Sequence, residues 1–449
     1  MVSELPQGWA ETTIGEICAM GPKSAWDDGM EIGFVPMSHA PTNFRGPLNY
    51  EPRPWHEVKK AYTHFENGDV IFAKVTPCFE NGKAALASGL PNGAGAGSSE
   101  FHVLRRRDAG ISPGYLLAVI KSAKFLREGE ENMTGAVGLR RVPRAFVESY
   151  PVRLPPEAEQ KRIAQKLDAL LAQVDTLKAR IDAIPALLKR FKSAALSTAV
   201  NGELTTEAPF QGRTVTLQEL VDESTVGIVR SSAEQFEDIS DLHPYLKMNN
   251  INQEWGFNTA KLTGVKASKE EVHRYELKSG DWLFNTRNSV ELVGKSCVWN
   301  GPKGFIFNNN ILRIRFTGDL LPEYAEIWFK SPSGKANLEK IKSATTSVAA
   351  IYQKSLMKEQ LPLPPVMQQQ EIVHRVEQLF AYADQLETKV AAAQKRIDAL
   401  TQSLLAKAFR GELVPQDPSD EPASVLLERI RTQRAATPKP KRGHKAATS

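Results

Sequence analysis

The stretch that decides the fold is LPPEAEQKRIAQKLDAL (residues 154–170), which recurs 209 positions later as LPPVMQQQEIVHRVEQL (residues 363–379). The two copies stay in register without a gap as far as Gly202-Glu203-Leu204, which meets Gly411-Glu412-Leu413 at the same offset. A match of this length without a gap indicates an internal duplication, the signature of a repeated architecture.

The segments that precede the two copies also match, although more loosely. They contain the same short motifs in the same order along the chain. The matched motifs are Gly68-Asp69 with Gly280-Asp281, Gly82-Lys83 with Gly294-Lys295, and Lys121-Ser122 with Lys330-Ser331. The chain is therefore predicted to run as a globule, a helix, a second globule, a second helix and a tail.

Apolar residues inside each copy alternate steps of three and four positions, which is the heptad pattern of helices that pack side by side. The predicted contact residues are Ile163, Leu167, Leu170, Val174 and Leu177 in the first copy, and Ile372, Val376, Leu379, Leu386 and Val390 in the second. The second globule connects the end of the first helix to the start of the second helix. Antiparallel packing brings both junctions to one end of the helix pair, so we expect the helices to be antiparallel.

The two globules have the pattern of mixed α/β domains. Short alternating apolar runs at residues 69–75 and 310–316 predict strands, and residues 115–126 and 324–335 predict helices. The predicted fold is two similar α/β domains separated by two long antiparallel coiled-coil helices, related by an internal pseudo-two-fold repeat. The predicted boundaries are 1–153 for the first domain, 154–205 for the first helical region, 206–362 for the second domain, 363–415 for the second helical region, and 416–449 for a C-terminal helix with a disordered basic tail.

The composition limits the class of protein. The 449 residues include 57 Lys and Arg against 52 Asp and Glu, so a nucleic-acid surface would have to be local. Cys18, Cys78 and Cys297 are widely spaced and form no zinc pattern. The first residues lack the pattern of a signal peptide, and no apolar run reaches the length of a membrane span. We therefore expect a cytoplasmic protein with reduced cysteines, no metal site and no membrane contact.

The sequence contains no complete motif for catalysis. Gly294-Lys295-Ser296 resembles the end of a phosphate-binding loop, but Ser289 stands where that motif needs its first glycine. The chain has no Asp-Pro-Pro-Tyr or Asn-Pro-Pro-Phe motif of an adenine methyltransferase, and its eight histidines show no metal spacing. We expect no catalytic residue and no cofactor in this chain.

Several of the duplicated motifs resemble the conserved regions of the specificity subunits of type I restriction-modification enzymes. These are Leu154-Pro155-Pro156 with Glu159-Gln160, residues 191–204, residues 378–384 and residues 406–413. The resemblance implies two target recognition domains separated by antiparallel helices, in a subunit that binds double-stranded DNA and is not itself an enzyme. It also implies assembly with two modification subunits, which methylate adenine from S-adenosylmethionine, and with restriction subunits that use ATP and Mg²⁺. The recognition domains vary freely in that family, so the bases recognised do not follow from the resemblance.

Candidate DNA contacts are polar side chains in loops that follow or end predicted strands, because Arg, Lys, Asn and Gln can form paired hydrogen bonds with a base edge. Asn is also a common turn former, which leaves a purely structural role open for about half of these residues. Arg140 and Arg141 precede the first helix and could contact phosphates or lie on a solvated face. The candidates are Ser38, His39, Asn43, Arg45, Lys74, Thr76, Arg140 and Arg141 in the first globule, and Lys247, Asn249, Asn250, Asn252, Asn285, Arg287 and Asn288 in the second.

Two similar but different recognition domains predict a split, asymmetric DNA target, with half-sites one or more helical turns of ~34 Å apart and a spacer set by the helices. Two alternatives remain open. An enzyme in its own right would need a cofactor motif or an acidic cluster, and a coiled-coil scaffold without DNA contact would not need two structured globules with Asn-rich loops.

The C-terminal segment is predicted in two parts. Residues 423–434 are amphipathic, with Val425, Leu426, Leu427 and Ile430 on one face, and we expect them to dock on a partner subunit or on the helix pair. Residues 437–449 are rich in Pro and Lys, which predicts disorder.

Overall fold

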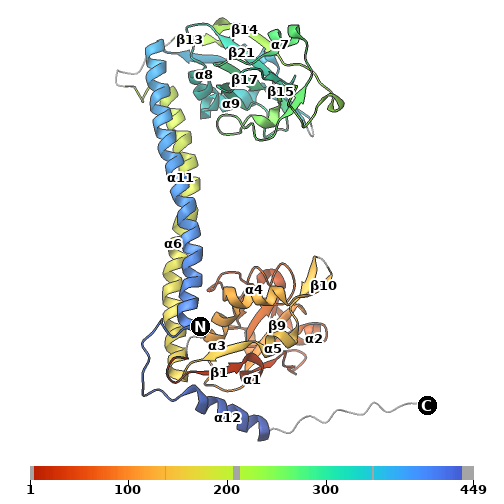
Figure 1. Cartoon of the computed structure of the whole chain (residues 1–449), viewed down its shortest axis with the longest axis vertical. Coiled ribbons are helices and arrows are strands. Elements are labelled where there is room, and N and C mark those ends of the chain that lie inside the picture. The colour runs from red at the N-terminus through yellow and green to blue at the C-terminus, as the bar shows by residue number, and fades with distance from the viewer. Residues whose placement is uncertain (1–4, 137, 206–212, 346–347, 437–449) are drawn as a thin grey trace, which may run out of the picture. The chain divides into compact units, whose positions relative to one another are not determined.

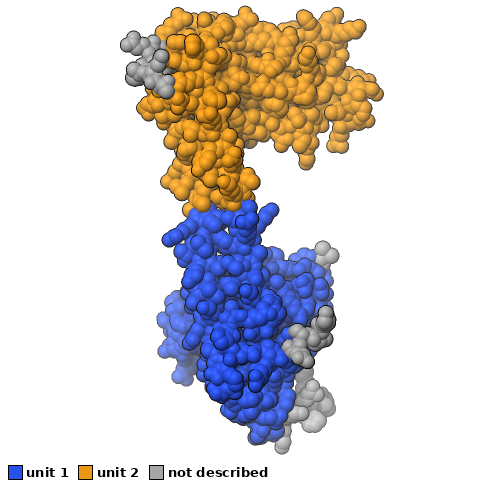
Figure 2. All heavy atoms as spheres, turned by 60° about the vertical axis from the view of Figure 1, so that its left-hand side comes forward, with its two compact units in different colours: residues 1–182, 392–449 blue, residues 183–391 orange. Residues whose placement is uncertain are grey.

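The computed structural model describes residues 5–136, 138–205, 213–345 and 348–436. The chain forms two compact units, residues 1–182 with 392–449 and residues 183–391 (Figure 2). The first unit contains the first globule and the second unit contains the second globule. Each unit also contains part of both long helices (Figure 1).

The first globule is built on two four-stranded sheets, ordered β2-β9-β6-β7 and β4-β3-β8-β5, and on the pair β1-β12. Strand β3 runs parallel to β8, and the other pairs in these sheets are antiparallel. Its strands are β1 (Ala10–Thr13), β2 (Cys18–Met20), β3 (Glu31–Val35), β4 (Glu51–Pro54), β5 (Thr63–Glu66), β6 (Val70–Ala73), β7 (Ala84–Leu86), β8 (Ala94–Gly97), β9 (Phe101–Arg106), β10 (Thr134–Ala136), β11 (Leu139–Arg141) and β12 (Pro151–Leu154). Its helices are α1 (Ile14–Ile17), α2 (Trp55–Val58), α3 (Pro113–Ile120), α4 (Ala123–Glu131) and α5 (Arg144–Ser149), with short 3-10 turns η1 (Met37–His39) and η2 (Pro91–Gly93).

The second globule repeats the first four-stranded sheet in the same order, while its second sheet has three strands where that of the first globule has four. Its sheets are β14-β21-β17-β19, β16-β15-β20 and β18-β23-β22, with the pair β13-β24. The strands are β13 (Arg213–Thr216), β14 (Val221–Val226), β15 (His243–Leu246), β16 (Thr263–Val265), β17 (Asp281–Asn285), β18 (Arg287–Asn288), β19 (Ser296–Trp299), β20 (Ile306–Phe307), β21 (Ile311–Phe316), β22 (Ser343–Ala344), β23 (Ala349–Ala350) and β24 (Gln360–Leu363). The helices are α7 (Lys269–Tyr275), α8 (Pro322–Lys330), α9 (Pro332–Ile341) and α10 (Gln353–Leu356), with η3 (Leu217–Leu220), η4 (Ser232–Glu234) and η5 (Met248–Asn250).

One pair of repeated glutamines shows that the duplication extends to individual hydrogen bonds. The fully buried Gln160 accepts from the backbone N–H of Ser112 (2.9 Å) and donates to the carbonyl of Pro155 (3.0 Å). The fully buried Gln369 accepts from Leu321 (2.8 Å) and donates to the carbonyl of Pro364 (2.8 Å). In both units this side chain joins the start of a long helix to the loop before a globule helix.

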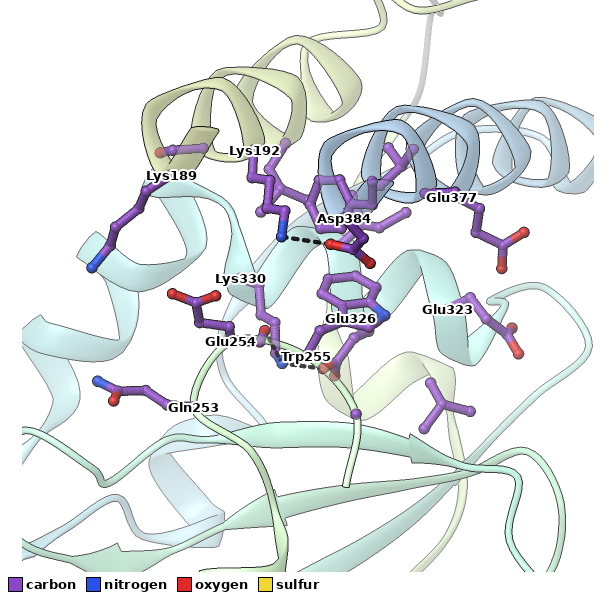
Figure 3. Close-up of a pocket in the computed structure, with 18 of the residues that line it drawn as sticks. Lys189, Lys192, Gln253, Glu254, Trp255, Glu323, Glu326, Lys330, Glu377 and Asp384 are labelled. Atoms are coloured by element: carbon purple, nitrogen blue, oxygen red, sulfur yellow. Dashed lines mark hydrogen bonds and ion pairs between the residues drawn. The ribbon is translucent and has the colours of Figure 1, made fainter. Parts of the chain in front are cut away.

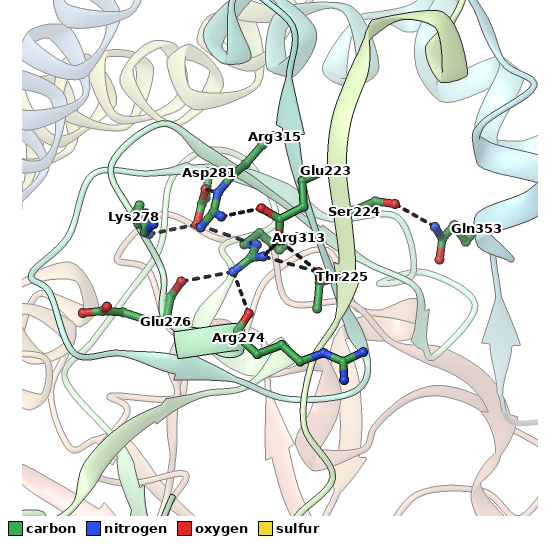
Figure 4. Close-up of polar contacts among 10 residues, drawn as sticks. All are labelled: Glu223, Ser224, Thr225, Arg274, Glu276, Lys278, Asp281, Arg313, Arg315 and Gln353. Carbon is green, nitrogen blue, oxygen red and sulfur yellow. Dashed lines mark hydrogen bonds and ion pairs between the residues drawn. The ribbon is translucent and has the colours of Figure 1, made fainter. Parts of the chain in front are cut away.

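The repeated Gly-Asp motif forms a turn in both globules. The Asp69 carboxylate accepts from the N–H of Glu66 (2.8 Å), and the Asp281 carboxylate accepts from the N–H of Lys278 (2.8 Å). Each carboxylate also accepts from an arginine of the neighbouring strand, at 2.7 Å from Arg105 and at 2.7 Å from Arg315. The second unit extends this pair into a larger network in which Arg313 and Asp281 are buried and Glu223 is partly exposed (Figure 4).

The two long helices, α6 (Glu157–Val200) and α11 (Val366–Phe409), pack together as antiparallel helices in each unit. In the first unit, Lys178 of α6 pairs with Asp398 of α11 (2.6 Å), and Asp182, which comes later in α6, accepts from Gln394, which comes earlier in α11 (2.8 Å). The two helices therefore run in opposite directions. In the second unit Lys192 pairs with Asp384 at 2.8 Å. The predicted fold class, two α/β domains with two long antiparallel helices, is therefore confirmed.

Most residues of the predicted heptad seam are buried. Leu170, Leu379 and Leu386 are half-buried, while Leu177 is 47% exposed and was wrongly placed in the seam. Leu171 is buried instead, because residues 163, 167 and 171 form an i, i+4, i+8 stripe that also covers the core of the first globule. The buried seam residues are Ile163, Leu167, Val174, Ile372, Val376 and Val390.

The C-terminal helix α12 (Ala423–Ala436) packs into the core of the first unit. Leu426, Leu427 and Ile430 are buried there, beside α1 and the start of α6. Val425 is 41% exposed, so the prediction that it shares the buried face is wrong. The predicted disordered segment, residues 437–449, lies outside the described residues.

Candidate nucleic-acid interface

Four of the candidate DNA contacts in the first unit come together where β6 ends. Val75 forms a bridge with Arg141, the N–H of Thr76 donates to the carbonyl of Arg140 (3.0 Å), and the N–H of Val142 donates to the carbonyl of Lys74 (2.8 Å). The backbone therefore places Lys74, Thr76, Arg140 and Arg141 side by side, although 64 residues separate Thr76 from Arg140.

Carboxylates neutralise the cations of this cluster. Arg141 binds both oxygens of Glu100 (2.8 and 2.9 Å), and the Lys74 ammonium lies 4.0 Å from the same carboxylate. Arg140 lies 3.5 Å from Glu80. The hydrogen bonds from Arg141, aided by the charge of Lys74, outweigh burial and hold the pKa of Glu100 below its usual range. A phosphate that binds here has to compete with Glu100 for the same two cations.

The corresponding corner of the second unit contains the exposed cation Arg287. Arg287 lies on β18, which pairs with β23, and its side chain is exposed. Asn288 is half-buried and donates to the side chain of Asn285 (2.8 Å). Asn285 is fully buried and donates to the carbonyl of Asn310 (3.0 Å). Its amide is used inside the protein, so Asn285 is not free to contact a base in this structure.

The loop after β3 carries the other candidates of the first unit. Ser38 and Asn43 are exposed, and His39 is half-buried in η1. Arg45 forms an ion pair with Asp168 of α6 (2.7 Å), which ties this end of the loop to the helix pair.

The loop after β15 carries the matching candidates of the second unit. Asn249 is exposed, and Asn252 donates to the carbonyl of Trp255 (3.0 Å). Lys247 donates to the side chain of Gln235 (3.0 Å). Asn250 is 3% exposed, and its amide accepts from the N–H of Lys247 and donates to two backbone carbonyls at 2.9 and 3.0 Å. Asn250 is therefore a turn residue, the alternative that the sequence left open for the asparagines.

The second unit also contains a groove of about 980 Å³ between the loop after β15, helix α8 and the two long helices (Figure 3). Its aromatic wall is the pair Trp255 and Phe380, whose ring centroids are 5.3 Å apart. Lys192 pairs with Asp384 on one side, and Lys330 pairs with Glu326 (2.9 Å) on the other. Sequence reasoning did not find this groove, because its lining comes from segments that are far apart in the chain.

The described residues supply no group of three His, Cys, Asp or Glu side chains that could hold a metal ion. Within the same part of the chain, no helix is both long enough and apolar enough to cross a membrane. Cys18 and Cys297 are buried free thiols, and burial raises the pKa of Cys18 to about 12.

Comparison with known proteins identifies the duplicated domain. The family model described as the type I restriction modification DNA specificity domain matches residues 6–186 and again residues 214–393. The specificity subunit of the type I restriction enzyme EcoKI from Escherichia coli K12 is 36% identical over 340 residues, which cover 73% of this chain and 73% of that subunit. The EcoEI specificity subunit from Escherichia coli is 30% identical over 495 residues, covering 90% of this chain and 83% of that subunit.

Solved structures show the same fold at low sequence identity. A chain from work on complex assembly and conformational transition of the type I R-M system has a TM-score of 0.74 at 21% identity, and the match covers 91% of this chain and 99% of that chain. The HsdS subunit from Thermoanaerobacter tengcongensis has a TM-score of 0.62 at 21% identity, covering 92% and 99%. Because the family model matches once in each repeat and accounts for most of the sequence, this chain belongs to the family of type I restriction-modification DNA specificity subunits.

Proposed function

We propose that this chain recognises a bipartite, asymmetric DNA sequence on behalf of a type I restriction-modification enzyme and has no catalytic residue of its own. Each globule recognises one half-site, and the helix pair sets the length of the spacer between them. The chain directs adenine methylation by two modification subunits, which use S-adenosylmethionine, and restriction by subunits that use ATP and Mg²⁺. The proposed complex acts on double-stranded DNA in the cytoplasm.

The observation that carries this proposal is a repeated scaffold with unrepeated loops. The order of one four-stranded sheet (β2-β9-β6-β7 and β14-β21-β17-β19), the glutamine contacts and the Gly-Asp turns recur in both globules. The loops at the ends of equivalent strands do not, since Ser38-His39 stands in one globule where Asn249-Asn250 stands in the other. Two similar frames with different polar loops suit two different half-sites.

A genome-wide map of N6-methyladenine tests the function directly. Cells that contain this chain together with its modification subunit are expected to show a methylated motif with two unlike halves, and cells without the chain are expected to lack it. An active modification complex that methylates no such motif would leave the chain without a specificity role and would favour the coiled-coil scaffold.

We call Lys74, Arg141 and Glu100 the Glu100 cluster. Two substitutions in it are expected to change the DNA affinity of the complex in opposite directions. Glu100→Gln frees Lys74 and Arg141 from their carboxylate, so non-specific DNA binding of the complex is expected to strengthen several-fold, with a steeper salt dependence. Arg141→Gln removes a cation, so binding is expected to weaken, with a salt slope smaller by about one. Fluorescence anisotropy titrations at several salt concentrations measure both effects.

Glu57→Gln is the matched control, because it makes the same change of charge at an exposed position on α2 of the same unit. If Glu100→Gln and Glu57→Gln change DNA affinity equally, the effect comes from net charge alone and the Glu100 cluster is not a phosphate site.

A further inference from the structure

Four lysines at repeated positions donate hydrogen bonds to the backbone of the loops that hold the candidate base contacts. We define the first clasped loop as residues 37–45, after β3, and the second clasped loop as residues 248–255, after β15. Lys83 and Lys121 contact the first loop, and Lys295 and Lys330 contact the second. The two pairs are the same Gly-Lys and Lys-Ser motifs that match between the repeats in sequence.

Lys121 lies at the end of α3 with 6% of its surface exposed. Its ammonium donates to the carbonyls of Pro41 (3.3 Å), Thr42 (3.1 Å) and Asn43 (2.8 Å), and to that of Gly82 (3.0 Å). Three consecutive carbonyls of the first clasped loop therefore point at one cation. The described residues place no carboxylate within ion-pair distance of it.

Lys83 holds the start of the same loop. It is half-buried just before β7, and its ammonium donates to the carbonyl of Met37 (2.9 Å). The N–H of Ala84 donates to the carbonyl of Pro41 (3.1 Å). The first clasped loop is thus fixed at both its start and its middle by residues outside it.

The second unit repeats the arrangement with different details. Lys295 donates to the carbonyls of Met248 (2.8 Å) and Ile251 (2.7 Å). Lys330, at the end of α8, donates to the carbonyl of Glu254 and lies 5.0 Å from the centroid of the Trp255 ring (Figure 3). Here a carboxylate, Glu326, also binds the lysine.

A lysine that binds backbone carbonyls can make these hydrogen bonds whatever side chains the loop carries. An ammonium has three donors, and every residue offers a carbonyl, so the same clasp fits loops of different sequence. Burial lowers the pKa of Lys121 to about 7, which shows that this position is costly for a charge. The four carbonyls that the Lys121 ammonium binds offset this cost, and an apolar side chain at the same position would leave them without this donor.

We infer that Lys83 with Lys121, and Lys295 with Lys330, are positioning residues that hold the two recognition loops in one backbone conformation while the loop side chains are left to determine the bases. The part of this inference that concerns base recognition rests on the proposed function, since the loops matter for specificity only if they meet DNA. The part that concerns the conformation of the loops does not depend on DNA.

The experiment compares Lys121→Met and Lys330→Met in the complex of the full chain with its modification subunits. Hydrogen exchange followed by mass spectrometry, without DNA, is expected to show at least tenfold faster exchange in residues 36–46 for Lys121→Met, and in residues 248–258 for Lys330→Met. Methylation of DNA with single base-pair changes is expected to show about tenfold weaker discrimination in the half-site of the altered unit only. The KM for cognate DNA should rise while kcat at saturating DNA is retained, because the loop is loosened and the methylating subunit is untouched.

Lys124→Met is the matched control, because Lys124 lies three residues from Lys121 on α4 with its side chain 66% exposed. It should change neither exchange nor discrimination. If Lys121→Met does not fold, Lys83→Met removes a single loop contact from a half-buried lysine and should give the same two effects at smaller size.

Unchanged exchange in the loop would overturn the positioning role whatever the DNA results are. Faster exchange with discrimination intact at both half-sites would show that the clasped loops do not determine the bases. A wild-type complex without any sequence preference would instead refute the proposed function, while the exchange result would still decide whether the lysines order the loops.

Discussion

Replacing Arg313 with methionine is expected to lower the free energy of unfolding of the second unit by about 3–5 kcal/mol, because it breaks a buried charge network from one side only. Arg313 is 1% exposed and donates to the carbonyls of Arg274 (3.2 Å) and Glu276 (3.1 Å) and to the carboxylate of Glu223 (Figure 4). Methionine can fill part of the space, but it leaves the two carbonyls without this donor and leaves Glu223 and Asp281 to share the single cation of Arg315. A domain has only about 5–15 kcal/mol of stability in total, so the loss should be plain in calorimetry and in urea unfolding.

The first unit shows that the fold does not need this network. The strand pairing places Val103 of β9 where Arg313 stands in β21, and Ala19 of β2 where Glu223 stands in β14. Val103 is fully buried in an apolar cluster. The double variant Arg313→Val with Glu223→Ala is therefore expected to be more stable than Arg313→Val alone, because it leaves Arg315 paired with Asp281 instead of with two carboxylates.

Arg274→Met is the control for the loss of a cation in the same network. Its side chain is exposed and contributes only its position 5.5 Å from the centroid of the Tyr275 ring, while its carbonyl stays in place. We expect a loss below about 1 kcal/mol. Equal losses for Arg274→Met and Arg313→Met would mean that the network contributes nothing specific to stability.

The sequence predicted correctly the features that depend on local periodicity. The duplication, the two long helices and the α/β character of the globules follow from the spacing of residues along the chain, which can be read without knowing which distant residues are in contact. The seam failed at Leu177 because alternating steps of three and four do not reveal which side of a helix a globule covers. Leu171 was missed for the same reason.

The polar chemistry of the site could be predicted only in part. Asn-rich loops were found, but a side chain that holds the backbone and one that meets a base look alike in sequence, and the amides of Asn250 and Asn285 are buried and bind backbone carbonyls. The hydrogen bonds from the lysines to the clasped loops join residues that are far apart in the sequence. Lys121 and Asn43, for example, are 78 residues apart. The one sequence signal of these lysines was the recurrence of Lys-Ser and Gly-Lys in both repeats, and recurrence does not tell what a residue contacts.

Ending the chain after Gln416, and so removing α12, is expected to destabilise the first unit by roughly 5 kcal/mol. Leu426, Leu427 and Ile430 are each at most 3% exposed, and burying such a side chain contributes about 1.5–3 kcal/mol. The truncation also removes the ion pairs of Asp420 with Arg162 (2.6 Å) and of Arg431 with Glu16 (2.6 Å). For a unit of this size the loss corresponds to a fall in melting temperature of roughly 10–20 °C.

Calorimetry of the truncated chain should resolve this fall from the behaviour of the second unit, whose core contains no residue of α12. A chain that ends after Ala436 keeps every α12 contact named above and serves as the control, with no change expected in either unit. Equal melting of all three chains would mean that α12 does not belong to the stable core of the first unit. The helix would then be free to bind elsewhere, as the amphipathic pattern of residues 423–434 first suggested, and the partner subunits would be the place to look for its contacts.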